Sequence, residues 1–272
     1  MATTPGESLP APVRRQRMLE LIGRDGFARV ADLGEAFRVS EVTIRSDLDL
    51  LDEQRAIRRV HGGAVLRGAG EPREPSFEES VGTSAAEKQS IAQAAAAFVR
   101  PGNSVILDVG STTAAIASAL VAREDLDDVT VITNGLTIAL ELEKAIPRFQ
   151  VIVTGGTLRP LQHSLVEPLA TAVLRELHAD LAFIGCNGVH PVNGITNINL
   201  PEADLKRVMV EAAERSIVVA DGSKIGRTHL GRVAAIDEVD DLITGGSADV
   251  GVLAALRESG LAVTVAGDAA RR

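Results

Sequence analysis

The 272-residue sequence predicts the α/β fold class, with a small N-terminal helical domain followed by a larger, Rossmann-like, mostly parallel α/β domain. Three observations predict this. Amphipathic helical patterns fill most of residues 13–53. Beyond residue 84, short apolar segments alternate with helical patterns, which is typical of a parallel sheet covered by helices on both faces. Between these parts, residues 67–83 are rich in Gly, Pro and acidic residues and lack periodicity, as an interdomain linker does.

The N-terminal part begins with a tail and continues with three helical patterns. Residues 1–12 are rich in Pro, Ser and Thr and are predicted to be disordered. A first helix is expected over residues 13–24 and a two-turn helix over residues 30–37. Three arginines near the start of the first helix either touch a DNA backbone or form a solvated helix end. They are Arg14, Arg15 and Arg17.

The third helix should begin at Ser40, whose hydroxyl can accept from the free amides of the first turn. Ile44, Leu48 and Leu51 are spaced by four and three residues, so they face a small core. The opposite face, which also carries Asp49, points outward and has the shape to enter a major groove. The predicted groove residues are Ser40, Val42, Thr43, Arg45 and Ser46.

A glycine-turned basic hairpin follows the third helix. Strands are predicted over residues 56–60 and 64–66, with a turn at 61–63 and a further short strand at 27–29. Cationic side chains there can neutralise phosphates beside the groove. They are Arg58, Arg59, His61 and Arg67. The order of cap, turn, apolar stripe and basic hairpin predicts a winged helix-turn-helix DNA-binding domain over residues 13–66. The alternative is a solvated basic hairpin beside an ordinary helical hairpin.

The larger domain, residues 84–266, is predicted to alternate strands and helices. Helices are expected at 87–99, 112–122, 136–145, around 167–177, at 201–214 and at 250–259. Strands are expected at 104–107, 129–132, 149–153, 181–184, 217–219, 241–243 and 262–265. The strands are apolar throughout, which favours a parallel sheet buried on both faces.

Polar and glycine-rich residues cluster where these strands end. Ligands of open parallel sheets bind beyond the carboxyl ends of the strands. The segment 108–113, DVGSTT, follows a strand and opens a helix, so its amides and hydroxyls can hold an anionic group. The alternative is a plain strand-to-helix turn. Glu202 and Lys206 are four residues apart and form either part of a charged site or an exposed helical salt bridge.

Composition excludes several classes of protein. No apolar run approaches the ~20 residues of a membrane helix, and the first residues lack the apolar centre of a secretory signal, so we expect a cytoplasmic protein with no membrane partner. The single cysteine, Cys186, has no cluster of metal ligands around it in the sequence. No dinucleotide or phosphate-loop signature is present, so no cofactor is predicted. The absence of Trp and Tyr disfavours a base-stacking RNA surface.

The net charge of −9 is divided unevenly. Residues 13–68 hold eleven basic and nine acidic side chains, a charge of +2, and the rest of the chain therefore carries −11. A mildly basic domain attached to an acidic one suits a protein that binds DNA at one end only.

The first domain resembles that of the DeoR-type family of bacterial transcriptional regulators, which carries Val-Ser-x-x-Thr-Ile-Arg-Arg-Asp-Leu and then Arg-x-His-Gly-Gly-Ala. The matching residues here lie at 39–48 and 59–64. Ser46 stands where the family usually has a second arginine, so one expected phosphate contact is shortened and uncharged. The linker also departs from the family, because Phe77 is followed by Glu78, Glu79 and Ser80 rather than by the usual arginine. No linker contact is therefore predicted.

The second domain resembles the DeoR-type effector domain, whose fold is similar to ribose-5-phosphate isomerase and to sugar-phosphate deaminases. The resemblance implies a phosphorylated sugar as inducer. It also implies a pocket of fourteen residues: Asp108, Gly110, Ser111, Thr112, Thr113, Thr133, Asn134, Gly155, Gly156, Asn187, Gly188, Glu202, Lys206 and Lys224. Glu167 stands where the family usually has glycine, and a carboxylate facing the pocket would repel a phosphate.

These observations together predict a DNA-binding transcriptional regulator and not an enzyme. We expect a repressor of a sugar or polyol catabolism operon that binds a double-stranded DNA operator, is relieved by a phosphorylated sugar, and forms a dimer or tetramer through its second domain. The rival is a sugar-phosphate isomerase or deaminase with an appended DNA-binding domain. That chemistry needs a general base beside the reacting carbon, for which Glu202 or Asp108 is available, but no distinct catalytic set accompanies them.

Overall fold

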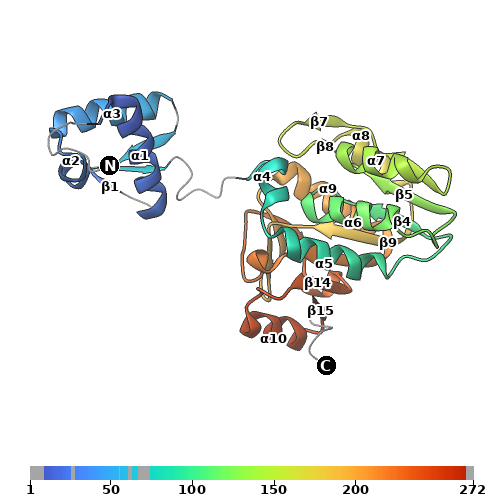
Figure 1. The fold of residues 1–272 in the computed structure, drawn as a ribbon. Helices are drawn as coiled ribbons and strands as arrows, with labels where there is room; N and C mark the ends of the chain where they lie inside the picture. Colours follow the sequence, from blue (N-terminus) through green and yellow to red (C-terminus); the bar gives the residue numbers. More distant parts are fainter. Residues whose placement is uncertain (1–8, 26–27, 55, 61–62, 67–73, 268–272) are drawn as a thin grey trace. The chain divides into compact units, whose positions relative to one another are not determined.

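The computed structural model describes residues 9–25, 28–54, 56–60, 63–66 and 74–267. The chain divides into a first unit, residues 1–73, and a second unit, residues 74–272 (Figure 1). None of the helices in the described ranges has the length and apolar character that crossing a bilayer requires.

The first unit contains three helices and a three-stranded sheet. The helices are α1 (Ala11–Asp25), α2 (Val30–Phe37) and α3 (Glu41–Glu53), and the strands are β1 (Ala28–Arg29), β2 (Ile57–Val60) and β3 (Gly63–Leu66). The strands pair antiparallel in the order β1-β3-β2. This is the predicted winged helix-turn-helix. Its core includes Met18 and Ile22 of α1, Leu33 of α2, and the predicted stripe of α3.

Arg14 has a structural position that the sequence did not suggest. Its side chain is 8% exposed, and its Nε lies 2.6 Å from Oδ2 of Asp47, which is also buried. Arg15 approaches the other oxygen of Asp47 at 3.6 Å. Neither alternative predicted for Arg14 is therefore correct, because its guanidinium joins α1 to α3 inside the unit.

The second unit is built on a seven-stranded sheet in which all neighbouring strands pair in parallel. The strands are β4 (Ser104–Leu107), β5 (Val129–Thr133), β6 (Phe149–Val153), β9 (Ala179–Gly185), β12 (Ala213–Ala220), β14 (Asp241–Gly245) and β15 (Ala262–Ala266). Their order is β15-β14-β12-β9-β4-β5-β6. The predicted mostly parallel α/β fold is confirmed.

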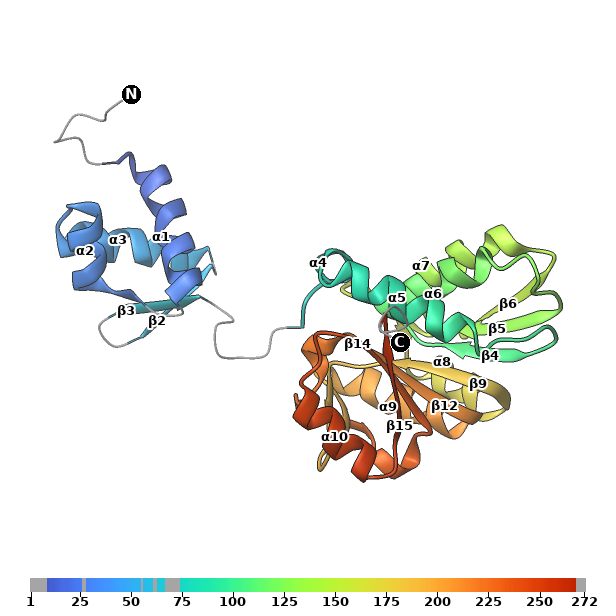
Figure 2. The same cartoon turned by 60° about the horizontal axis from the view of Figure 1, so that its bottom comes forward.

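Helices cover both faces of this sheet, as Figure 2 shows. The helices α5 (Ala85–Ala96), α6 (Ser111–Val121) and α7 (Leu136–Leu142) pack on one face, and α8 (Leu169–Arg175), α9 (Leu200–Glu211) and α10 (Val250–Glu258) on the other. Alternate residues of one strand serve the two layers: Val105 and Leu107 join the first core, whereas Ile106 joins the second. Both faces are apolar because both are buried.

The strand order reverses between β4 and β9. From β4 the chain proceeds through β5 to β6 on one side, and from β9 it proceeds through β12 and β14 to β15 on the other. Open parallel sheets bind their ligands in the crevice at such a switch point, beyond the carboxyl ends of the strands. This topology places the ends of β4 and β9, Asp108 and Gly185, at the expected site.

Several short elements of the second unit differ from the sequence prediction. The helix α4 (Phe77–Gly82) lies within the stretch predicted as an aperiodic linker, and it is initiated by a capping box between Ser76 and Glu79. A hairpin joins β7 (Thr157–Arg159) to β8 (Ser164–Val166), and a second sheet contains β10 (Gly188–His190), β11 (Gly194–Asn197) and β13 (Gly231–Ala234). Single 3-10 turns occur at Glu143–Ala145, Gly222–Lys224 and Ile236–Glu238.

Candidate functional site

The outer face of α3 is formed as the sequence predicts. Thr43 N donates to Oγ of Ser40 at 3.2 Å, so Ser40 caps the helix. Val42 is 73% exposed although it is apolar, and Arg45 and Ser46 are exposed beside it. Arg45 bonds only to the neighbouring Glu41, at 2.8 Å, among the described residues. An exposed pair of this kind is weak and can be exchanged for a DNA contact.

The hairpin beside α3 is only partly described. Arg59 forms an ion pair with Asp49 of α3, so this predicted phosphate contact is engaged within the first unit. The side chain of Arg58, together with His61 and Arg67, lies outside the described residues. The hydroxyls of Ser40 and Thr43 are 2.9 Å apart and bond to each other.

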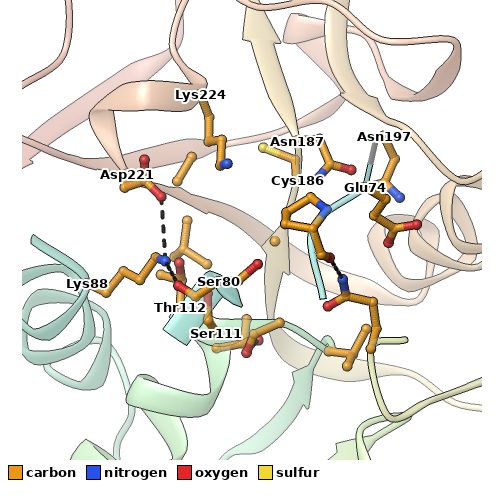
Figure 3. Close-up of a pocket in the computed structure, with 18 of the residues that line it drawn as sticks. Glu74, Ser80, Lys88, Ser111, Thr112, Cys186, Asn187, Asn197, Asp221 and Lys224 are labelled. Atoms are coloured by element: carbon orange, nitrogen blue, oxygen red, sulfur yellow. Dashed lines mark hydrogen bonds and ion pairs between the residues drawn. The ribbon is translucent and has the colours of Figure 1, made fainter. Parts of the chain in front are cut away.

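A cavity of about 160 Å³ lies at the switch point of the second unit (Figure 3). Its walls come from the ends of β4, β9 and β12, from the start of α6, and from residues 74–83. Eight of the fourteen predicted pocket residues line it: Gly110, Ser111, Thr112, Thr113, Asn187, Glu202, Lys206 and Lys224.

The start of α6 presents donors to the cavity. Gly110 precedes the helix at φ 144°, and the first helical hydrogen bond runs from Ala114 N to Gly110 O. The amides of Ser111, Thr112 and Thr113 therefore have no partner within the helix. These amides and the positive end of an eleven-residue helix favour an anion.

Two lysines add positive charge to the cavity. Lys224 is partly exposed, and its ammonium group makes no hydrogen bond or ion pair with the described residues. Lys88 is buried, and its Nζ donates to the carbonyls of Ser80 at 2.5 Å and Thr83 at 2.7 Å. Burial lowers the pKa of Lys88, while Asp221, 3.9 Å away, opposes this effect.

Carboxylates and amides lie on the other side of the cavity. Figure 3 shows Glu74 and Asn197 on the side opposite Lys88 and Asp221. Glu202 is also buried there, and its Oε1 accepts from Oγ of Ser164 at 2.7 Å. These groups accept hydrogen bonds from hydroxyls, so the cavity combines an anion-binding side with a hydroxyl-binding side.

A buried ion pair supports the cavity. Lys206 Nζ bonds to Oδ2 of Asp108, which also accepts from Gly185 N at 2.9 Å. Burial raises the pKa of Asp108 to about 6, and the positive charge of Lys206 limits the rise. The carboxylate in turn raises the pKa of Lys206. Burial also raises the pKa of Cys186 to about 12, so its thiol is neutral.

Six predicted pocket residues do not line the cavity, and the three of them with polar side chains use those side chains in contacts within the protein. Asp108 holds Lys206 and β9. Asn134 accepts from Val109 N at 3.0 Å and donates to Leu165 O at 3.2 Å. Thr133 accepts from Gly135 N at 3.1 Å. The sequence placed them correctly at strand ends, but their side chains point into loop contacts.

The three glycines among these six provide close backbone packing. At Gly156, with φ 128°, an added Cβ would lie 2.2 Å from Val166 O. At Gly188 it would lie 2.5 Å from Arg227 O, and Gly155 adopts φ 71° in the same turn as Gly156. Glu167 is exposed and lies outside the cavity lining, so the predicted repulsion of a phosphate does not arise.

Several lining residues were missed by the sequence reasoning. They are Glu74, Pro75, Glu79, Ser80, Thr83, Lys88, Gln162, Asn197, Val219 and Ala220, whereas Val109, Gly185, Cys186 and Asp221 lie in strand-end segments that the sequence had indicated. Lys88 had a signal, since it shares a helical stripe with Ile91, Ala92 and Ala95, and a lysine on a buried stripe needs a specific partner. For Gln162 and Asn197, which follow or end short strands, the sequence carries no comparable signal.

Two family models match the chain. The DeoR-like helix-turn-helix domain matches residues 14–68, and the DeoR C terminal sensor domain matches residues 83–246. The chain belongs to the DeoR family. The HTH-type transcriptional regulator GlpR of Haloferax volcanii is 35% identical over 258 residues, covering 94% of this chain and 97% of that protein. The glycerol-3-phosphate regulon repressor of Escherichia coli K12 is 29% identical, covering 90% and 95%.

Membership in the DeoR family makes the protein a DNA-binding transcriptional regulator and not an enzyme. The structure of ribose 5-phosphate isomerase A from Methanocaldococcus jannaschii is similar over 50% of this chain and 52% of the isomerase, at 20% identity and a TM-score of 0.38. That similarity is too slight to inform function.

Proposed function

We propose that this DeoR-family protein represses a sugar or polyol catabolism operon and releases its operator when a phosphorylated sugar or polyol binds the cavity of the second unit. The observation that carries the ligand class is the cavity at the β4/β9 switch point, whose lining includes the unpartnered amides of α6 and the ammonium of Lys224. The name of the glycerol-3-phosphate regulon repressor supports the same class.

The ligand orientation follows from the charges of the two sides. The phosphate bonds to the amides at 111–113 and to Lys224, because an anion is stabilised there by the helix end and by an ammonium. The hydroxyl groups bond to the carboxylates and amides on the opposite side, among them Glu202 and Asn197. A neutral sugar lacks the anionic group, and inorganic phosphate lacks the sugar hydroxyls, so each can make only one of these two sets of contacts.

Operator binding is assigned to the outer face of α3 and to the hairpin. Arg45 and Ser46 enter the major groove, while Arg58 and His61 contact flanking phosphates. A homo-oligomer formed through the second unit carries two such DNA-binding domains. The protein acts in the cytoplasm, where the operator is found. The ligand releases DNA only if it binds one arrangement of the oligomer more tightly than the other.

The test is a titration of operator DNA in the presence of phosphorylated sugars and polyols. Lys224→Met should bind operator as the parent does without ligand, but should need at least about tenfold more ligand for release, since a charged hydrogen bond is lost. Lys144→Ala, an exposed lysine on the Glu143–Ala145 turn, is the matched control. The proposal is contradicted if no phosphorylated compound releases the operator. It is also contradicted if Lys224→Met needs no more ligand for release than the parent does.

A further inference from the structure

Residues 74–83, called the strap here, are the first described residues after the end of the hairpin domain and belong to the second unit. The strap contains α4 and ends where α5 begins. Five of its residues line the cavity: Glu74, Pro75, Glu79, Ser80 and Thr83. The segment that leads to the DNA-binding unit is therefore also a wall of the ligand site.

The strap is held mainly by the β7–β8 hairpin. Phe77 N donates to Leu161 O at 3.0 Å, and Gln162 Nε2 donates to Pro75 O at 2.6 Å. The rings of Phe77 and His163 meet edge to face at 5.7 Å. His163 also bonds to Glu78 at 2.7 Å, and Lys88 of α5 holds the carbonyls at the end of α4.

One arginine joins the strap to the cavity floor. Arg159 Nη1 donates to Oε1 of Glu74 at 2.9 Å and to Oε1 of Glu202 at 2.6 Å. Both carboxylates line the cavity, whereas Arg159 stands behind them. Two carboxylates share one guanidinium, so a negative charge remains on this side. Oε1 of Glu202 already accepts from both Arg159 and Ser164, whereas the oxygens of Glu74 can each accept a further hydrogen bond.

We propose that Glu74 binds hydroxyl groups of the ligand and that a bound ligand thereby fastens the strap to the second unit. This inference rests on the proposed function, because it takes the ligand to be a phosphorylated, hydroxylated compound. Arg159 is the positioning residue that aims Glu74 and Glu202 at the same ligand.

The coupling follows from the positions of the two sides. A ligand whose phosphate bonds to α6 and whose hydroxyls bond to Glu74 connects the strap to the sheet edge. It binds the docked strap more tightly than an undocked one, so it shifts the strap towards docking. By linkage, any change that loosens the strap lowers ligand affinity by the same factor.

Hydrogen exchange of the strap amides in the full-length protein tests this inference. The probes are inorganic phosphate, glycerol 3-phosphate, ribose 5-phosphate and galactosamine 6-phosphate. Inorganic phosphate should bind at the α6 side and slow exchange in residues 77–82 less than a hydroxylated phosphate does, because it makes no hydroxyl contact with Glu74. At least one hydroxylated phosphate should slow that exchange severalfold. If hydroxylated phosphates bind but leave hydrogen exchange of the strap unchanged, this inference is wrong and the proposed function stands. If no probe binds, both the inference and the proposed function are wrong.

Two variants separate direct binding from coupling. Glu74→Gln should weaken a hydroxylated phosphate about fivefold or more and leave inorganic phosphate unaffected. Phe77→Ala changes no cavity residue, yet it should speed strap exchange and weaken the hydroxylated phosphate about threefold through linkage. Leu140→Ala, an exposed apolar residue of α7, is the matched control and should change neither. Unchanged affinity in Phe77→Ala despite faster strap exchange refutes the coupling.

Discussion

Replacing Lys206 by methionine removes the cationic partner of Asp108 while keeping an apolar stem of similar length in α9. Lys206 is 3% exposed and Asp108 is fully buried. Oδ1 of Asp108 has no hydrogen-bond partner among the described residues, so the amide of Gly185 on Oδ2 would be its remaining contact. The variant must therefore either bury a carboxylate without a cation or protonate it.

The loss of stability in Lys206→Met depends on pH, and the direction of the pKa shift of Asp108 determines at which pH the loss is larger. Burial raises the pKa of Asp108 from 3.8 to about 6, which corresponds to about 3 kcal/mol of lost stability at neutral pH, at ~1.4 kcal/mol per unit. Because the pKa of Asp108 is higher in the folded protein, protonation of Asp108 contributes fully to stability below pH 3.8. This stabilisation is lost as the pH rises through 6. Without Lys206 the pKa rises further, so the additional loss at pH 8 should be about 3–5 kcal/mol.

Hydrogen exchange of the β4 and β9 amides in urea measures the stability of the second unit at pH 5 and pH 8. Lys206→Met should differ from the parent by about 1 kcal/mol or less at pH 5, where Asp108 is protonated in both proteins. The double variant with Asp108→Asn should recover most of the loss at pH 8, because no buried charge remains. An equal loss at both pH values would refute the assignment to Asp108.

Three further predictions concern the DNA-binding unit and one turn of the second unit. Arg45→Ala should weaken operator binding by about 1–3 kcal/mol in a fluorescence anisotropy titration, while thermal unfolding stays within ~0.5 kcal/mol of the parent, because its bond to the helix is exposed. Asp47→Ala should destabilise the first unit by about 3–5 kcal/mol in urea, since Arg14 stays buried without its partner, and a loss below ~1 kcal/mol would contradict this. Gly156→Ala should destabilise the second unit by about 2 kcal/mol or more by the same method, because its Cβ would overlap Val166 O at a positive φ; full stability would show that the turn can shift.

The regular elements of the fold were predictable where one physical signal dominated. The strands Ser104–Leu107 and Phe149–Val153 match their predicted bounds, because short runs of mainly apolar residues are flanked by polar or glycine residues. The three-residue strands β7 and β8 were missed because three residues are too few to establish a period. Helix α4 was missed because its capping box stands in a sequence otherwise rich in Gly, Pro and acidic residues.

The site was predictable as a location but not side chain by side chain. Strand ends and glycines indicated the correct edge of the sheet, and the residues of the β4 and β9 ends are there. Polar and glycine-rich residues at the ends of the strands were expected to cluster at the site. The β5 and β6 ends contribute none of the lining, because the switch point lies between β4 and β9 and the sheet continues away from it. Whether Asn134 faces a ligand or a backbone amide depends on the neighbouring loop, which the local sequence does not specify.

Asn134 also has a consequence for how such proteins diversify. Its amide joins the β4–α6 turn to the β7–β8 hairpin and does not line the cavity, whereas Asn197 and Gln162 do. The residue that joins these two loops is thus absent from the cavity wall, whereas Asn197 is part of it. Substitutions at position 197 can change which metabolite is recognised across a lineage while the loop contacts of Asn134 remain intact.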